Sequence, residues 1–351
     1  MDIPRSALPP GVLSLHILPA EHHDRDWDAI IVPREVKERL LAQALLVLQH
    51  GRKLSMLSGL PHGLIVLAGP PGTGKTTMAR GLAQVAALAL ARQGATALVE
   101  INPHAFPSDM LGESQRNVTR LLSETIPEIA ARRPHVIVLI DEVESFAVRR
   151  STASFEANPV DVHRATDAVL LGIDEIAKNL PSVLFVTTTN FITAVDEAFL
   201  SRADLVMTFS LPDRETIERI LDHALGELAV QWPTLLPLTE DRAHMSQLAA
   251  LCEGWDGRRI RKLVLAALAQ RVEVARDPAA LSWEDLITAA RKKGGVEWAG
   301  GRALTSREMF PDVPGELMHD HDHGHALHDH DDGHDHDHPH AHRHTQTHQK
   351  E

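Results

Sequence analysis

Apolar runs of strand length alternate along the chain with amphipathic segments of helix length. Four of the five runs are almost continuously apolar, which is typical of strands covered on both faces of a sheet. The alternation predicts an α/β fold in which helices flank a parallel sheet on both sides. The predicted strands are residues 63–69, 97–102, 135–141, 182–190 and 205–211.

The pattern changes at both ends of this region. Before it, apolar residues recur at helical spacing between Trp27 and Gln49. After Pro212 only helical patterns occur, and the Ser282 hydroxyl is suited to cap a helix that begins at Trp283. We therefore predict five segments. They are a loose, flexible lead-in (1–20), a large α/β domain (21–212), a small all-helical domain (213–295), a linker (296–318) and a disordered tail (319–351).

The formal net charge of −13 is unevenly distributed. Residues 312–351 hold ten Asp/Glu and two Lys/Arg, a net of −8, which leaves −5 for the rest of the chain. The folded part therefore lacks the positive field that strong nucleic-acid binding requires. The single cysteine, Cys252, excludes an intrachain disulfide framework and indicates a reducing compartment. Without a signal-peptide pattern or an apolar run near the ~18 residues of a membrane span, we expect a cytoplasmic protein with no membrane association.

The strongest local motif is GPPGTGKTT at residues 69–77, which fits G-x-x-x-x-G-K-[ST] between a predicted strand and a predicted helix. Its glycines let the backbone curl so that N–H groups point at phosphate oxygens. Lys75 supplies a positive charge for the β and γ phosphates, and the Thr76 hydroxyl can bind Mg²⁺. The predicted nucleotide-binding residues of this loop are Gly69, Pro70, Pro71, Gly72, Thr73, Gly74, Lys75, Thr76 and Thr77.

A second motif, VIVLIDE, ends a predicted buried strand with two carboxylates. Asp141 is placed to bind Mg²⁺ together with Thr76, and Glu142 is the predicted general base for the attacking water. Asn190 closes the next predicted strand, where it can hold that water beside the γ-phosphate. Together with the glycine-rich loop, these residues predict Mg²⁺-dependent ATP hydrolysis.

Two arginines are further candidates for phosphate contacts. Arg202 precedes the last predicted strand and can act as an arginine finger on a neighbouring subunit's nucleotide, with a surface salt bridge as the alternative. Arg258 begins a helix of the C-terminal domain and can reach the nucleotide of its own subunit. Arg259 and Arg261 are rivals for that second role.

The order of these motifs resembles that of AAA+ ATPases over about residues 16–295. Within that family, the segments DEVESF, DAVLLGIDEI, TTTNFITAVDEAFLSRADL and GWDGRRIRKL look like the HORMA-remodelling branch, which includes pachytene checkpoint protein ATPases, thyroid-receptor-interacting protein ATPases and bacterial relatives. The resemblance implies a large AAA+ domain, a helical lid and a ring, usually a hexamer, that uses ATP hydrolysis to pull on a protein. It implies the roles given above for Lys75, Glu142, Asn190, Arg202 and Arg258.

The resemblance also implies a substrate-gripping pore loop at SDMLGES (108–114). Met110 and Leu111 stand where the family has an aromatic–aliphatic pair; Met is adaptable, but simple core packing is the alternative. Residues 149–163 are either a second pore loop or an ordinary loop. Only about twenty residues precede the resembling region, as in bacterial relatives that act on HORMA proteins of antiphage signalling systems. We therefore expect direct engagement of a HORMA-like protein.

The tail interleaves histidine with aspartate and holds 13 of the chain's 23 histidines within residues 319–348. Imidazoles and carboxylates suit Zn²⁺, Ni²⁺ or Cu²⁺. Without fixed spacing or apolar residues, the segment should be disordered and bind ions weakly in many arrangements. Metal buffering and a passive solubilising role both stay open. The predicted weak ligands are His319, His321, His323, His325, His328, His330, His334, His336, His338 and His340.

Two other function classes fit part of the sequence. A metallochaperone-type ATPase would store Ni²⁺ or Zn²⁺ on the tail and would require the metal to alter turnover. A DNA-linked, clamp-loader-like AAA+ protein would use the same nucleotide motifs, but the acidic charge disfavours it.

Overall fold

The structure is a computed structural model, and all residues that it describes belong to one unit of the chain, Met1–Glu297. The predicted pore residues Met110 and Leu111, the linker and the His-rich tail lie outside the described residues. The described residues are 8–54, 56, 61–102, 113–145, 147 and 159–292.

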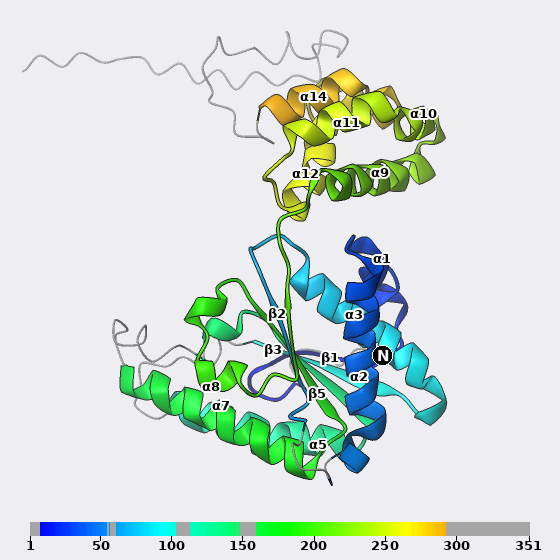
Figure 1. Ribbon diagram of the computed structural model, residues 1–351. Coiled ribbons are helices and arrows are strands. Elements are labelled where there is room, and N and C mark those ends of the chain that lie inside the picture. Colours follow the sequence, from blue (N-terminus) through cyan, green and yellow to red (C-terminus); the bar gives the residue numbers. More distant parts are fainter. Residues whose placement is uncertain are drawn as a thin grey trace, which may run out of the picture. The chain divides into compact units, whose positions relative to one another are not determined.

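Six strands of the described chain form one sheet in the order β1-β3-β4-β5-β2-β6. The predicted α/β fold is confirmed, because β2 to β6 all run parallel to one another. Strands β2 to β5 are buried along their whole length, as their continuous apolar runs predict. Helices lie on both sides of the sheet (Figure 1). The strands are β1 (Val12–Leu18), β2 (Leu64–Ala68), β3 (Thr96–Ile101), β4 (His135–Ile140), β5 (Val183–Thr189) and β6 (Leu205–Thr208).

Strand β1 corrects the prediction of a loose lead-in over residues 1–20. It pairs antiparallel with β3, so that His16 lies opposite Leu98 and Leu18 opposite Thr96. It is an edge strand, and of its residues only Leu18 is fully buried. A half-exposed edge strand lacks the unbroken apolar run that marks the central strands, and this is why the hydrophobic pattern did not reveal it.

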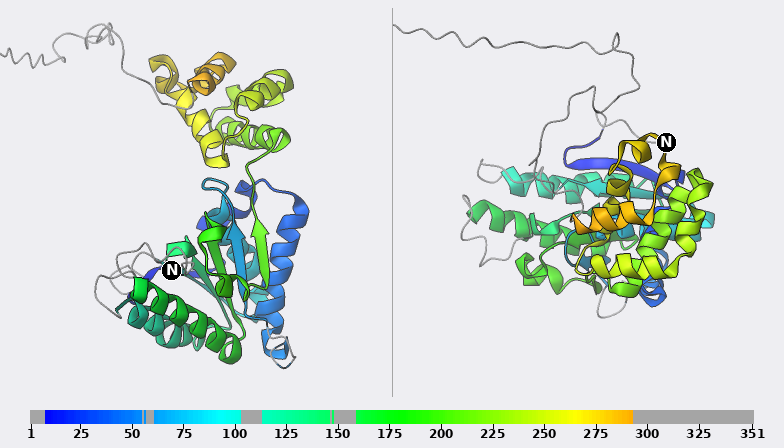
Figure 2. Two further views of the ribbon diagram at one scale, coloured as in Figure 1. Left: turned by 60° about the vertical axis from the view of Figure 1, so that its left-hand side comes forward. Right: turned by 90° about the horizontal axis from the view of Figure 1, so that it is seen from above.

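Helices cover both faces of the sheet. Helices α2 and α3 share one apolar core with one face, whereas α4, α5 and α7 share a second core with the other. The left view in Figure 2 shows the strands between α2, in blue, and α7, in green. The helix expected from Trp27 to Gln49 is broken into two at Pro33. The helices are α1 (Asp26–Ala29), α2 (Arg34–Leu54), α3 (Lys75–Leu90), α4 (Glu113–Arg120), α5 (Ile126–Ala130), α7 (Pro159–Asn179) and α8 (Glu197–Leu200).

The described residues after Asp213 form only helices, and their apolar side chains build a third core of their own. Ser282 caps α14 as predicted, in a capping box with Asp285. The predicted boundary at residue 212 coincides with the start of α9, although the domain limits stay a prediction. Among the described helices, none is both long and apolar enough to span a bilayer. The helices are α9 (Arg214–Gln231), α10 (Leu236–Glu240), α11 (Arg242–Leu251), α12 (Gly257–Leu268), α13 (Val272–Arg276) and α14 (Trp283–Arg291).

Candidate active site

The glycine-rich loop connects the carboxyl end of β2 with the first turn of α3, in the context that its sequence predicts. Gly72 and Gly74 have φ of +79° and +88°, which side chains rarely adopt. A Cβ on Gly72 would lie 2.0 Å from Asp256 Oδ1, and one on Gly74 would lie 2.5 Å from Ile30 Cδ1. The glycines therefore provide both the turn and the close packing around a loop whose amides can receive phosphate.

Lys75 is the buried cation of this loop. Its Nζ donates hydrogen bonds to Gly69 O at 2.8 Å, to Pro70 O at 2.9 Å and to Asn190 Oδ1 at 2.9 Å. Burial lowers the pKa of Lys75, and the attraction of Asp141 and neighbouring carboxylates opposes this shift. The ammonium is held in place by neutral oxygens, so the carboxylates remain available for other ligands.

Asp141 follows β4 and accepts two hydroxyl hydrogen bonds on one oxygen. Thr76 Oγ1 lies 2.7 Å from Asp141 Oδ1, and Thr188 Oγ1 donates to the same atom. Thr188 Oγ1 also accepts a hydrogen bond from Glu142 N at 3.1 Å. A carboxylate next to a hydroxyl is the all-oxygen donor set that Mg²⁺ prefers, so these residues fit a magnesium ion bound with ATP.

Glu142 and Asn190 are brought together, as the sequence predicts. Asn190 Nδ2 donates to Glu142 Oε1 at 3.0 Å, while Asn190 N donates to Glu144 Oε1 at 2.9 Å. Glu142 has a φ of +55°, which is unusual for a residue other than glycine and is often found at functional sites. Asn190 thus links Lys75 to Glu142, and the polar groups needed around a γ-phosphate converge on one edge of the sheet.

A cavity of about 660 Å³ adjoins the glycine-rich loop. It is lined by Gly72–Gly74, by the apolar segment Ile30–Val32, by residues 208–213 and by the first turns of α12. The loop amides at one end of the cavity suit the triphosphate of a nucleotide, and the apolar side chains nearby suit its base. The residues present therefore fit ATP.

Of the three neighbouring arginines, Arg258 is best placed for this cavity. Its backbone N–H donates to Gly72 O at 3.1 Å, and its exposed side chain lines the cavity. The guanidinium of Arg259 instead lies 3.9 Å from the ring centroid of Trp255. Arg261 also lines the cavity, but it donates to Ala29 O at 2.7 Å. The sequence favoured Arg258 and left Arg259 and Arg261 as rivals, and these contacts favour Arg258 as well.

Arg202 makes an ion pair within its own chain. Its Nε and Nη2 each donate to the Asp174 carboxylate at 2.8 Å, and its Nη1 donates to Ala198 O at 2.8 Å. The hydrogen bond from Arg202 lowers the pKa of Asp174. This geometry corresponds to the salt-bridge alternative for Arg202, and the finger role stays a prediction.

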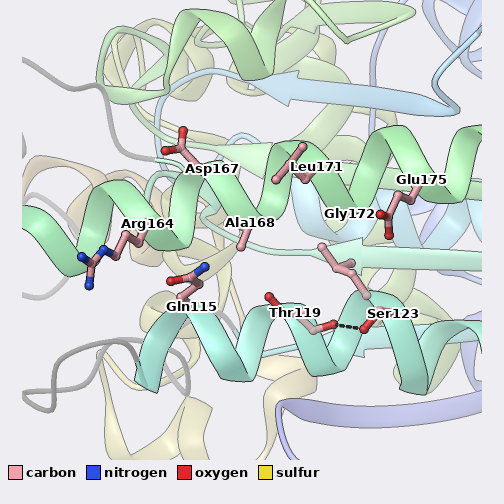
Figure 3. Close-up of a pocket in the computed structure, with 10 residues that line it drawn as sticks. Gln115, Thr119, Ser123, Arg164, Asp167, Ala168, Leu171, Gly172 and Glu175 are labelled. Carbon is pink, nitrogen blue, oxygen red and sulfur yellow. Dashed lines mark hydrogen bonds between the residues drawn. The ribbon is translucent and has the colours of Figure 1, made fainter.

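A second pocket of about 230 Å³ lies between α4 and α7 (Figure 3). Both helices begin within the predicted pore loops, at Glu113 and Pro159, so the last residues of each predicted loop are helical. Gln115 and Thr119 of α4 and Arg164 and Asp167 of α7 are among the residues that line the pocket. The two helices pack on each other. The loop residues Met110 and Leu111 themselves are outside the described residues.

Sequence analysis missed several residues around the nucleotide motifs. Thr188 connects Asp141 with Glu142, and Glu144 holds the Asn190 backbone. Ile30–Val32 line the cavity from a segment about forty residues before the glycine-rich loop. The repeated threonines before Asn190 and the second acid after Asp141 were visible signals, but their roles depend on the pairing of β4 with β5.

Comparison with known proteins identifies the family. The model for the ATPase family associated with various cellular activities (AAA) matches residues 65–211. CD-NTase-associated protein 6 from Pseudomonas aeruginosa is 43% identical over 298 residues, which cover 85% of this chain and 97% of that protein. The chain belongs to the AAA ATPases. This AAA ATPase is also similar to the pachytene checkpoint protein 2 homolog of Arabidopsis thaliana, which is 32% identical over 81% of this chain and 67% of that protein.

Solved structures agree with this assignment. C. elegans PCH-2 superimposes on the AAA ATPase with a TM-score of 0.64 and 25% identity, covering 82% of this chain and 76% of that one. A chain of the E. coli MS115-1 HORMA:CdnC:Trip13 complex gives a TM-score of 0.64 at 21% identity, covering 80% of this chain and 95% of that one, which shows the shared fold. As a member of this family, the protein binds ATP and hydrolyses it to ADP and phosphate.

Proposed function

We propose that this AAA ATPase is a ring-forming ATPase that remodels a HORMA protein of a bacterial antiphage signalling system. The observation that carries the proposal is the 43% identity that extends over 97% of CD-NTase-associated protein 6. The solved complex that unites HORMA, CdnC and Trip13 supports the same substrate class. These relatives favour protein remodelling over a metallochaperone or a clamp loader.

Hydrolysis would proceed by attack of water on the γ-phosphorus and cleavage of the bond to the β-phosphate oxygen, leaving ADP. Lys75 and the loop amides would bind the phosphates, and Thr76 with Asp141 would hold Mg²⁺. The metal would neutralise phosphate charge when bound. Glu142 would take the proton of the attacking water at its carboxylate, and Asn190, 3.0 Å from Glu142 Oε1, would orient that water.

The coupling of hydrolysis to mechanical work requires more than one chain. We expect Arg202 to reach the γ-phosphate of the next subunit in a hexamer, and Arg258 to contact the nucleotide of its own subunit. Met110 and Leu111 would grip the substrate chain in the central pore, since apolar side chains of adaptable shape can hold many sequences. The first turns of α4 and α7 would carry the pore loops.

The test uses Glu142→Gln with a HORMA protein of the kind found in the HORMA:CdnC:Trip13 complex. The variant should bind ATP, hydrolyse it at least about a hundredfold more slowly and retain the HORMA partner in a stable complex. Glu240→Gln, at an exposed position outside the site, is the matched control and should behave as the unmodified protein. Vigorous ATP hydrolysis that never inactivates or dissociates the HORMA partner would overturn the substrate assignment, and retained hydrolysis in Glu142→Gln would remove Glu142 as the base.

A further inference from the structure

A cluster of three histidines lies at the edge of the sheet, outside the nucleotide site. His16 is on β1, and His22 and His23 belong to the short 3-10 turn that follows it, Glu21–His23. One ring nitrogen from each residue lies within 4.8 Å of those from the other two. We propose that His16, His22 and His23 form a binding site for a divalent transition-metal ion of the Zn²⁺ type.

The state of His23 is the strongest support for this site. The residue is only 5% exposed, and its Nδ1 lies 2.8 Å from Asp26 Oδ2. Its Nε2 is buried and has no hydrogen-bond partner among the described residues. A buried polar atom without a partner is costly, and a bound metal ion would satisfy it. Histidines that bind zinc commonly donate one ring N–H to a carboxylate and bind the metal through the other ring nitrogen, and His23 is placed to do the same.

Local structure holds the cluster in place. Gln84 of α3 accepts from Ala20 N at 3.0 Å and donates to Asp24 Oδ1 at 2.6 Å, so it anchors the turn on both sides. His16 is fixed by the pairing of β1 with β3. A folded framework therefore holds the three imidazoles in place, whereas the histidines of the C-terminal tail have no fixed spacing in the sequence.

The geometry requires only small movements. Tetrahedral zinc with Zn–N distances of about 2.0–2.1 Å separates its nitrogen ligands by about 3.3–3.4 Å. The present separations are up to 4.8 Å, so the rings must move closer by about 1–1.5 Å, and the exposed His22 side chain is free to rotate toward the other two. The cluster lines a cavity of about 530 Å³, which leaves room for an ion and a fourth ligand such as water. The Ser14 hydroxyl lines the same cavity and lies two residues before His16, on the same face of β1.

The surrounding charges suit a dication. The Arg80 guanidinium, which also lines the cavity, is paired with Glu100 through two hydrogen bonds of 2.7 and 3.0 Å. Its positive charge is therefore largely compensated. Asp26 contributes a negative charge directly behind His23. Three imidazoles backed by one carboxylate favour Zn²⁺ over Mg²⁺ or Ca²⁺, which prefer oxygen ligands.

The experiment must separate this cluster from the His-rich tail. It uses the full-length chain in which the 13 histidines of residues 319–348 are replaced by asparagine. Titration with Co²⁺, a spectroscopic substitute for Zn²⁺, should give one equivalent with a visible absorption typical of tetrahedral coordination, and Zn²⁺ should displace it. In this background, His22→Asn should weaken Co²⁺ binding more than about a hundredfold, because loss of an outer hydrogen-bond partner alone costs about 10–100-fold.

Two further variants sharpen the test. Asp26→Asn should weaken binding by about 10–100-fold while leaving one equivalent, since it removes only the carboxylate behind His23. His50→Asn, at an exposed position on α2, is the matched control and should bind Co²⁺ as the parent does. Preserved ATP hydrolysis in His22→Asn would show that this variant is folded. The proposal is overturned if the parent takes up no stoichiometric Co²⁺, or if His22→Asn gives the same spectrum and affinity.

Discussion

At the residue scale, the site depends on side chains that fix the backbone around the two strand-end carboxylates. Thr188 both donates to Asp141 and accepts from Glu142 N, so one hydroxyl sets the positions of the proposed magnesium ligand and the proposed base. Glu142 in turn adopts a left-handed conformation that needs such support. Substitutions of side chains that position Asp141 and Glu142 should therefore lower the rate of hydrolysis more than the affinity for the nucleotide.

Thr188→Val tests this positioning role. Valine has nearly the same shape but cannot make either hydrogen bond, so we expect kcat for ATP to fall by about 10–100-fold with little change in nucleotide affinity. Thr188→Ser should restore most of the activity because it restores the hydroxyl. Thr187→Val, one residue earlier on β5, is the control, since the Thr187 hydroxyl makes only a long 3.4 Å hydrogen bond to Ile65 O. Equal losses in the two valine variants would contradict a specific role for Thr188.

The sequence identified the site residues that belong to short contiguous motifs. The glycine-rich loop and the Asp141–Glu142 pair are each contiguous, so their spacing alone was informative, and the structure brings Thr76 and Asp141 together as expected. The contribution of Thr188 could not be predicted, because it depends on which residues of β4 and β5 lie side by side. Likewise, nothing in the spacing of Arg258 and Arg259 indicated that Trp255 would engage only the second.

At the scale of elements, the hydrophobic pattern predicted β2 to β5 because each is buried on both faces, and it also predicted the partly exposed edge strand β6. It failed for β1, which is half exposed, and for the helix that Pro33 divides. The hydrophobic pattern also does not reveal where a helix packs closely against the backbone of another segment. Gly51 of α2 is one such place, since a Cβ there would lie 1.7 Å from Pro181 O.

Two glycine-to-alanine substitutions in helices should therefore have opposite effects on stability. Gly51→Ala should lower the free energy of unfolding, at the upper end of the roughly 1–3 kcal/mol that overpacking costs, because the backbone at Pro181 must move. Gly226→Ala in α9 meets nothing within 4 Å and should raise it by about 0.5–1 kcal/mol through helix propensity. Chemical denaturation followed by circular dichroism measures both. Stabilisation by Gly51→Ala would show that the packing of α2 is looser than described.

The start of α14 should make the C-terminal helices sensitive to acid. The pKa of Asp285 is lowered to about 2 by hydrogen bonds from Arg271 and Ser282. A carboxylate with a lowered pKa stabilises the fold above its unfolded pKa of about 3.9, and this contribution is lost as the pH falls through about 2. The half-exposed Arg271 limits the contribution to about 1–2 kcal/mol.

Asp285→Asn removes this contribution. At neutral pH the variant should unfold more easily by about 1–2 kcal/mol, and the difference from the unmodified protein should vanish towards pH 2. Thermal unfolding at a series of pH values between 2 and 7 provides the measurement. Asp277→Asn is a useful comparison, because Asp277 caps only the short 3-10 turn Pro278–Ala280. A constant difference at all pH values would argue against the proposed ionisation.

At the scale of the whole molecule, one chain brings together only part of the proposed catalytic set. Lys75, Glu142 and Asn190 are joined by hydrogen bonds, whereas Arg202 is paired with Asp174 of the same chain. A ring would explain this separation, because a residue that is remote from its own site can complete the site of a neighbour.

Mixing two inactive variants tests whether sites form between subunits. Lys75→Ala cannot bind phosphate properly but keeps Arg202, whereas Arg202→Ala keeps Lys75 and should lose about 10³-fold or more of its ATPase rate. In rings assembled at random from equal amounts, roughly a quarter of the sites would combine an intact Lys75 with an intact neighbouring Arg202, so activity should recover to about that fraction. Asp174→Asn, which breaks the ion pair but keeps the arginine, separates a structural defect from a catalytic one. If the mixture stays inactive although it forms rings, or if Asp174→Asn is as inactive as Arg202→Ala, Arg202 supports the fold of its own chain and is not the finger.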